Sequence, residues 1–185
     1  MLDESRQALS ALIEQYAGQH PDEAVTCERL LQFVRSHPDC FSRSCVPGHV
    51  TSSAWLFDTT GKRVLLTHHK KLDIWVQLGG HMEGEARVLD SALREAREES
   101  GIDGIRVCSE ALFDIDIHEI PARGEDPAHL HYDCRFALQT ETTDAFELTD
   151  ESVELRWVAV HKVRGLTDEE SVLRMVRKSP GVALA

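Results

Sequence analysis

The chain opens with apolar residues at helical spacing. The first of these stretches predicts an amphipathic helix that ends near Gly18, because its apolar residues recur every three or four positions. Those residues are Leu9, Leu12, Ile13 and Tyr16. A second helix is predicted over Val25–Val34, stopped before Pro38, and a loop rich in Cys and Ser then runs from Phe41 to Pro47.

After residue 48 the pattern changes to short runs rich in β-branched and aromatic residues. These runs predict a strand at 50–57, a turn at 58–62 and a partner strand at 63–68. A short strand at 74–78 ends at Gly79-Gly80. Further strands are predicted at 105–108, 112–120, 131–140 and 154–160, with a loop between residues 120 and 129.

Two more helices are predicted among these strands. The first runs from about Arg87 to Ser100 and is closed by Gly101, a residue that readily adopts the left-handed conformation at a helix end. The second runs over residues 167–177 and opens with the cap-like sequence Thr-Asp-Glu-Glu. We therefore expect an α/β domain over residues 48–185, preceded by a helical extension over residues 1–47.

Charge and composition narrow the class of protein. The 185 residues include 20 Lys and Arg against 32 Asp and Glu, a formal charge of −12, which argues against binding long nucleic acids. No apolar run is long enough to span a membrane, and the first residues lack the pattern of a signal peptide. Five cysteines without a CxxC pair favour thiols over a disulfide framework. The expected protein is soluble and cytoplasmic.

The helix over residues 87–100 carries the most informative chemistry. At 3.6 residues per turn, Glu95, Glu98 and Glu99 fall within a sector of roughly 100°, beside the apolar stripe of the helix. Clustered carboxylates near a helix C-terminus repel one another, and a divalent cation such as Mg²⁺ or Mn²⁺ would relieve that repulsion. Arg94 is placed to pair with Glu98, one turn later. An ordinary solvated helix with Glu–Arg pairs is the alternative.

The residues around this helix resemble the Nudix box, the signature of Nudix hydrolases. The signature has a glycine, five residues, a Glu, seven residues and then the pattern REUxEExGU, where U is a bulky apolar residue. The matching positions in this chain are Gly80, Arg94, Glu95, Glu98, Glu99, Gly101 and Ile102. Ala96 is small for the U position, and Ala86 stands where the signature has its first Glu. Glu85 lies one residue earlier and Glu83 three residues earlier, and either is an alternative to the missing Glu.

The resemblance implies a Nudix-like α/β/α sandwich with a mixed sheet. It also implies a Mg²⁺-dependent (or Mn²⁺-dependent) hydrolase that cleaves a diphosphate linkage in a nucleoside diphosphate derivative or a related small pyrophosphate, by attack of activated water on phosphorus. The implied metal ligands are Glu95, Glu98, Glu99 and the carbonyl of Gly80. The implied base is Glu95 or Glu98, and Glu147, Asp150 and Glu151 are alternatives on a later loop.

Two other functions stay open within this resemblance. Because Ala86 replaces the first Glu of the signature, one alternative is a domain that binds a nucleotide metabolite as a sensor without catalysis. An isomerase of the isopentenyl diphosphate type is disfavoured, because the chain shows no matching context for a catalytic cysteine. A homodimer through the N-terminal helices is a further alternative, and membranes are not expected partners.

Several residues outside the box are weaker candidates. Lys70, Lys71 and Arg123 could contact phosphate groups. His131 and its neighbours His129, Tyr132 and Asp133 fit a pocket-lining role better than a second metal site. Cys40 and Cys45 with His37 and His49 are spaced too loosely for a usual zinc pattern. Trp157 is expected to pack in the core, and Trp75 is expected either to pack there or to stack on a base.

Overall fold

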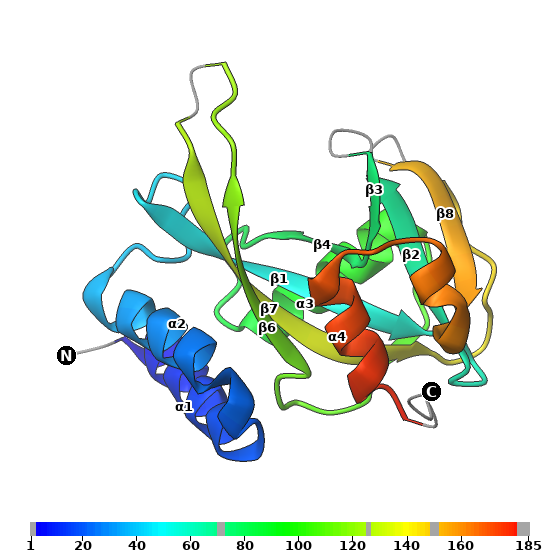
Figure 1. Ribbon diagram of the computed structural model, residues 1–185, viewed down its shortest axis with the longest axis horizontal. Helices are drawn as coiled ribbons and strands as arrows, with labels where there is room; N and C mark the ends of the chain where they lie inside the picture. Colours follow the sequence, from blue (N-terminus) through cyan, green and yellow to red (C-terminus); the bar gives the residue numbers. More distant parts are fainter. Residues whose placement is uncertain (1–2, 70–72, 125–126, 149–151, 181–185) are drawn as a thin grey trace.

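The computed structural model describes residues 3–69, 73–124, 127–148 and 152–180, and it shows a mixed sheet covered by helices on both faces (Figure 1). Its helices are α1 (Glu4–Gln19), the 3₁₀ helix η1 (Pro21–Glu23), α2 (Ala24–Ser36), α3 (Val88–Ser100), the 3₁₀ helix η2 (Val160–Gly165) and α4 (Glu170–Lys178). Its strands are β1 (Gly48–Phe57), β2 (Arg63–His69), β3 (Ile74–Val76), β4 (Leu78–His81), β5 (Ile105–Val107), β6 (Asp114–Ile120), β7 (His129–Thr140) and β8 (Ser152–Ala159). The expected α/β sandwich is confirmed.

The centre of the sheet is the parallel pair β1 and β7. Their register runs without a break from Gly48 opposite Leu130 to Phe57 opposite Gln139. Strands β5 and β6 pair with β7, while β4 pairs with the middle of β1 and β2 meets only its end. Strands β3 and β8 flank β2, so this part of the sheet diverges from β4 (Figure 1). The divergence leaves β4 and its glycines beside the middle of β1.

The two faces of the sheet carry different cores, because successive side chains of a strand point to opposite faces. On β1, Val50, Ala54 and Leu56 belong to a hydrophobic cluster with α1, α2 and α3. Trp55 and Phe57 belong to a second cluster with residues of α4 and η2. Helix α4 therefore covers one face, and α3 with the N-terminal helices covers the other.

Helix α3 is hydrogen-bonded to the sheet near its start and capped by a glycine at its end. Near its start, the Ser52 hydroxyl of β1 donates to the carbonyl of Val88 at 2.6 Å. At its end, Gly101 has φ 67°, the left-handed conformation expected from the sequence. This hydrogen bond and the glycine cap set the rotation and the length of α3, and so decide where its carboxylates lie.

The N-terminal helices share the core of the sheet. Phe33 of α2 stacks on Tyr132 of β7, with ring centroids 3.9 Å apart and planes 7° from parallel. On the other side, Lys178 of α4 pairs with Glu23 at 2.6 Å and contacts the hydroxyl of Tyr16. Helices α1 and α2 are therefore joined to both the sheet and the last helix.

Two boundary predictions were wrong. The single strand predicted at 74–78 is two strands, because β3 pairs with β2 whereas β4 pairs with β1. Helix α1 does end near Gly18, at Gln19, because His20 precedes Pro21 and a residue preceding proline is disfavoured in helical conformation. The last helix starts at Glu170 and not at Thr167, whose hydroxyl accepts a hydrogen bond from the Glu169 amide at 3.3 Å instead.

None of the helices in the described ranges has the length and apolar character needed to cross a membrane. The cytoplasmic location stays a prediction.

Candidate active site

The carboxylate of Glu95 lies directly on the backbone of Gly80. A Cβ built on Gly80 would lie 2.4 Å from Oε1 of Glu95 and 2.6 Å from its Cδ, so no larger residue fits without moving Glu95. Glu95 is buried, with 8% of its surface exposed. Gly80 and Glu95, which are 15 positions apart in the sequence, thus meet between β4 and α3.

Glu99 and Glu98 occupy two different environments. Glu99 is also 8% exposed, and its Oε1 accepts a hydrogen bond from the Gly79 amide at 3.4 Å. The Glu98 side chain is 58% exposed. Two carboxylates therefore line the contact between α3 and β4, while the third reaches solvent at its edge.

Arg94 joins these groups into one network. Its guanidinium donates to Glu95 at 3.0 Å, to Glu98 at 2.7 Å and to the His81 carbonyl at 2.7 Å. Burial lowers the pKa of Arg94, but its hydrogen bonds to the carboxylates of Glu85 and Glu98 outweigh burial and raise that pKa overall. Arg94 thus supplies a permanent positive charge among the box carboxylates.

Glu85 is a fourth carboxylate of this network. Its Oε1 accepts from Nε of Arg94 at 2.5 Å, and its Oε2 accepts from the Glu83 amide at 2.7 Å. Burial raises the pKa of Glu85, but these two hydrogen bonds lower it overall. The Glu83 side chain lies farther away, 4.0 Å from Arg94, and is 57% exposed. Of the two alternatives to the missing box glutamate, Glu85 makes the closer contact.

The other predicted site residues are more dispersed. Glu147 is exposed beside the end of α3, where its amide donates to the Ser100 carbonyl at 2.8 Å. Arg123 is exposed between β6 and β7. Lys70, Lys71, Asp150 and Glu151 lie outside the described residues. Trp157 is partly buried and donates from Nε1 to the Asp144 carbonyl at 2.7 Å, which agrees with a packing role.

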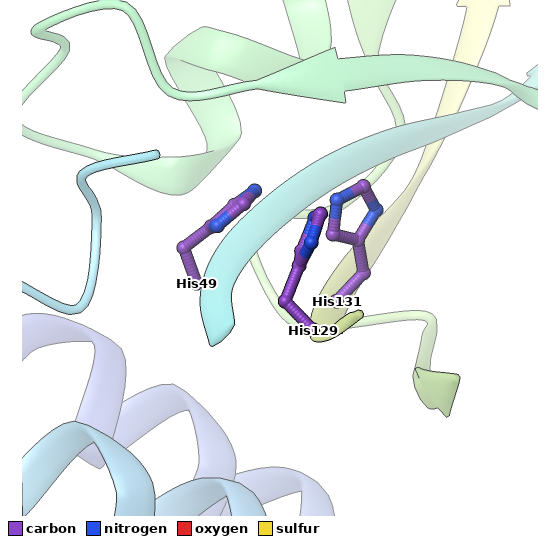
Figure 2. Close-up of side chains that lie close together, drawn as sticks. All are labelled: His49, His129 and His131. Carbon is purple, nitrogen blue, oxygen red and sulfur yellow. The ribbon is translucent and has the colours of Figure 1, made fainter. Parts of the chain in front are cut away.

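His131 lies in a group of histidines that was not predicted from the sequence. His49 faces His131 across the parallel pair of β1 and β7, with ring centroids 4.8 Å apart, and the ring of His129 is 5.2 Å from that of His131 (Figure 2). Burial is the main cause that lowers the pKa of His49 to about 4 and that of His131 to about 2. Because residues two apart in a strand point to the same face, the sequence spacing of His129 and His131 indicates that their side chains lie together. Only the register of β1 with β7 places His49 beside them.

Cys40 and Cys45 take no part in this group. Both are buried, and burial raises their pKa values to about 12 and about 11, so both thiols stay protonated at neutral pH. The potential metal ligands that the described residues gather are His49, His129 and His131.

Comparisons with known proteins identify the fold. The sequence model of the NUDIX domain matches residues 47–177. A Caenorhabditis elegans Ap4A hydrolase is similar in structure, with TM-score 0.56, 16% identity, and coverage of 70% of this chain and 93% of that one. Two others are the Escherichia coli dihydroneopterin triphosphate pyrophosphohydrolase (TM-score 0.56, 21% identity, 70% and 92% coverage) and a MutT protein from Methanosarcina mazei (0.57, 17%, 72% and 96%). No curated protein matches.

The structural likenesses concern the fold, since all three identities are below 25%. The sequence match spans most of the chain and includes the whole segment from Gly80 to Ile102. The contact of Gly80 with Glu95 and the carboxylate network around Arg94 lie within that match. The chain belongs to the Nudix hydrolase family.

Proposed function

We propose that this Nudix pyrophosphohydrolase uses Mg²⁺ to cleave a diphosphate linkage in a nucleoside diphosphate derivative or a related small organic pyrophosphate. The observation that carries the proposal is the cluster of three carboxylates: Glu95 lies on Gly80, Glu99 accepts from the Gly79 amide, and Arg94 pairs with both Glu95 and Glu98. Two proteins of similar fold are described as an Ap4A hydrolase and a dihydroneopterin triphosphate pyrophosphohydrolase, which are both diphosphate-cleaving activities.

The donor atoms of this group fit Mg²⁺. Carboxylate and carbonyl oxygens are the hard ligands that Mg²⁺ prefers, and Glu95, Glu98, Glu99 and the Gly80 carbonyl would hold it. Bound there, the ion neutralises phosphate charge and lowers the pKa of the attacking water. This local compensation also explains how a chain of formal charge −12 accepts an anionic substrate.

The carboxylates have different roles in the proposed reaction. Glu95 is pinned between Gly80 and Arg94, whereas Glu98 is the carboxylate that solvent reaches. We assign Glu98 as both a ligand and the acceptor of the proton from the attacking water, and Glu95 and Glu99 as ligands alone. Glu147, beside the end of α3, stays an alternative base.

Glu85 takes the place of the missing box glutamate in this proposal. Its hydrogen bond to Arg94 keeps the guanidinium oriented toward Glu95 and Glu98. Ala86 is therefore compatible with an active enzyme, which disfavours the alternative of a non-catalytic sensor.

We also infer that residues 1–47 are an extension to a Nudix domain of residues 48–185, since the family match begins at residue 47. A homodimer through this extension stays a prediction.

The test is turnover of a substrate panel by the full chain. ADP-ribose, diadenosine tetraphosphate and nucleoside triphosphates are incubated with protein and Mg²⁺ in water labelled with ¹⁸O. Attack on phosphorus puts ¹⁸O into a phosphate product. Glu98→Gln is expected to lower kcat by about 10²- to 10⁴-fold at saturating Mg²⁺, the usual contribution of a general base. Glu99→Gln is expected to raise the Mg²⁺ concentration needed for half-maximal rate.

Glu14→Gln, which neutralises an exposed carboxylate of α1, is the matched control and should keep full activity. Tight binding of a panel member without turnover would favour the sensor. Turnover that survives chelation, or that is unchanged in both box variants, would contradict the proposal.

A further inference from the structure

Five histidines from four strands gather on one face of the sheet. The register places His49 beside His131 and His118 opposite His131, while His81 pairs with Thr51, two residues after His49. The ring of His131 lies 4.8 Å from that of His49, 5.0 Å from His81, 5.5 Å from His118 and 5.2 Å from His129. Apart from His131, a weak candidate for substrate contact, none of these rings has a part in the proposed hydrolysis.

Two of these rings hold buried nitrogen atoms without the hydrogen bonds that buried polar groups normally make. His49 is 3% exposed, and neither of its ring nitrogens has a hydrogen-bond partner among the described residues. Nε2 of His131 is also buried without a partner there. A buried polar atom left unpaired costs about 1–3 kcal/mol, so three such atoms in one place indicate an absent ligand.

The protonation of His129 suits a cation. Nδ1 of His129 lies 2.9 Å from the Pro127 carbonyl, which can only accept. His129 therefore carries its proton on Nδ1 when neutral, and its Nε2 lone pair is free to coordinate.

We propose that His49, His129 and His131 bind one first-row transition-metal ion of the Zn²⁺ type (Figure 2). One ligand nitrogen from each lies within 4.8 Å of the other two. Zn–N bonds are about 2.0–2.1 Å, so closing this triangle around an ion needs a shift of less than about 1 Å per nitrogen. Three imidazoles leave a fourth position for water or an anionic oxygen.

The donor atoms separate this site from that of the box. Imidazole nitrogen favours Zn²⁺ and its neighbours in the first row, whereas the oxygens of Glu95, Glu98 and Glu99 favour Mg²⁺. The two sites also lie on opposite faces of the sheet, because Gly80 faces Glu95 of α3 whereas the side chain of His81, the next residue of β4, lies beside His49. The ring of His81 contacts His49 at 4.9 Å, and its carbonyl accepts from Arg94 at 2.7 Å. The proposal does not rest on the proposed hydrolysis, because the histidines bind the ion whether or not Glu98 supports turnover.

Cobalt titration of the full chain, purified without a polyhistidine tag and stripped with a chelator, tests this site. Tetrahedral Co²⁺ bound by nitrogen absorbs visible light far more strongly than octahedral Co²⁺ bound by carboxylates. The wild-type protein is expected to show these bands with one equivalent of Co²⁺ and to lose them on adding Zn²⁺. Substitutions His129→Gln and His131→Gln should each weaken binding by more than about 100-fold, since even a supporting residue near a metal changes affinity by 10–100-fold.

Two controls assign the ion to the histidines. His161→Gln, at an exposed histidine of η2, should leave the bands unchanged, and so should the pair of Glu98→Gln and Glu99→Gln. His131 lies inside the strand, so its variant could unfold, whereas His129 is the first residue of β7. Zn²⁺ should raise the Tm of the wild type and not that of His129→Gln.

Absence of the tetrahedral bands in the folded wild type would overturn the proposal. So would bands that persist in both histidine variants, or bands that vanish only in the Glu98 and Glu99 variants. The last result would place the ion at α3 and would leave the proposed hydrolysis standing.

Discussion

Glu95 and Gly80 are in direct contact, with the carboxylate of α3 lying where a side chain on β4 would be. Gly80→Ala would put a methyl group 2.4 Å from Oε1 of Glu95 and force the carboxylate away. A displacement of about 1 Å at a catalytic group can cost about 100-fold in rate, and we expect a loss of that order in kcat. Steady-state kinetics with the substrate identified by the panel measure it.

Gly165→Ala is the matched control for this change. A Cβ at Gly165, at the end of η2, meets no atom within 4 Å, and kcat should stay at the wild-type value. Equal activity of both alanine variants would show that the position of Glu95 is not needed for turnover.

Glu85 is expected to act through Arg94. Glu85→Gln removes the charge that holds Nε of Arg94, and kcat should fall by about 10- to 100-fold, as for other residues that orient metal ligands. Adding Ala86→Glu, which restores the glutamate of the family signature, should recover most of the loss. Glu83→Gln should have little effect, because that carboxylate is exposed and 4.0 Å from Arg94. A positioning role would be refuted if Ala86→Glu failed to rescue a folded Glu85→Gln protein.

Phe33 should contribute to the stability of the whole chain. Because its ring stacks on Tyr132 of β7, Phe33→Ala is expected to lower the free energy of unfolding by about 3–5 kcal/mol. Val25→Ala, in the same helix at a residue that is 72% exposed, should change it by less than about 0.5 kcal/mol. Urea unfolding followed by fluorescence measures both. Similar values for the two variants would mean that α2 contributes little to the core.

Asp58 is expected to make the free energy of unfolding fall at acid pH. Its side chain is 1% exposed and accepts from Nε of Arg63 at 2.7 Å and from the Lys62 amide at 2.9 Å. Burial raises the pKa of Asp58, but the hydrogen bonds from Arg63, Lys62 and Thr60 lower it overall. The unfolded chain, with a carboxyl pKa of about 3.9, therefore takes up this proton before the native state does, and stability falls as the pH drops below about 4.

Asp58→Asn should lower the free energy of unfolding at pH 7 by about 1–3 kcal/mol, the cost of losing hydrogen bonds to a charged group. The difference from wild type should shrink as the pH approaches 3. Asp103→Asn, at an exposed position, is the control with no expected change. Urea unfolding at pH 3 and pH 7 checks the sign, and a difference that widens in acid would contradict it.

The elements of this fold could be predicted from the sequence because their signals are local. The helical spacing of Leu9 to Tyr16 and the glycine after Ser100 each depend on residues within a few positions, and α1 and α3 follow them. The family and the carboxylates of the box could also be predicted from the sequence, since the fixed spacing between Gly80 and Ile102 is a property of the sequence alone. Boundaries failed where pairing decides them, as at Gln77, where the chain passes from β3 on β2 to β4 on β1.

The environment of each site residue depends on contacts between distant segments. Sequence spacing grouped Glu95, Glu98 and Glu99 together, but packing of α3 on β4 buries two of them and leaves Glu98 in solvent. It also brings Glu85, and not Glu83, onto Arg94. The histidines show the same limit most clearly, because His49 and His131 are 82 positions apart and become neighbours only through the parallel register of β1 and β7. A local pattern carries no record of which strands pair, since pairing is settled by the burial of the whole sheet.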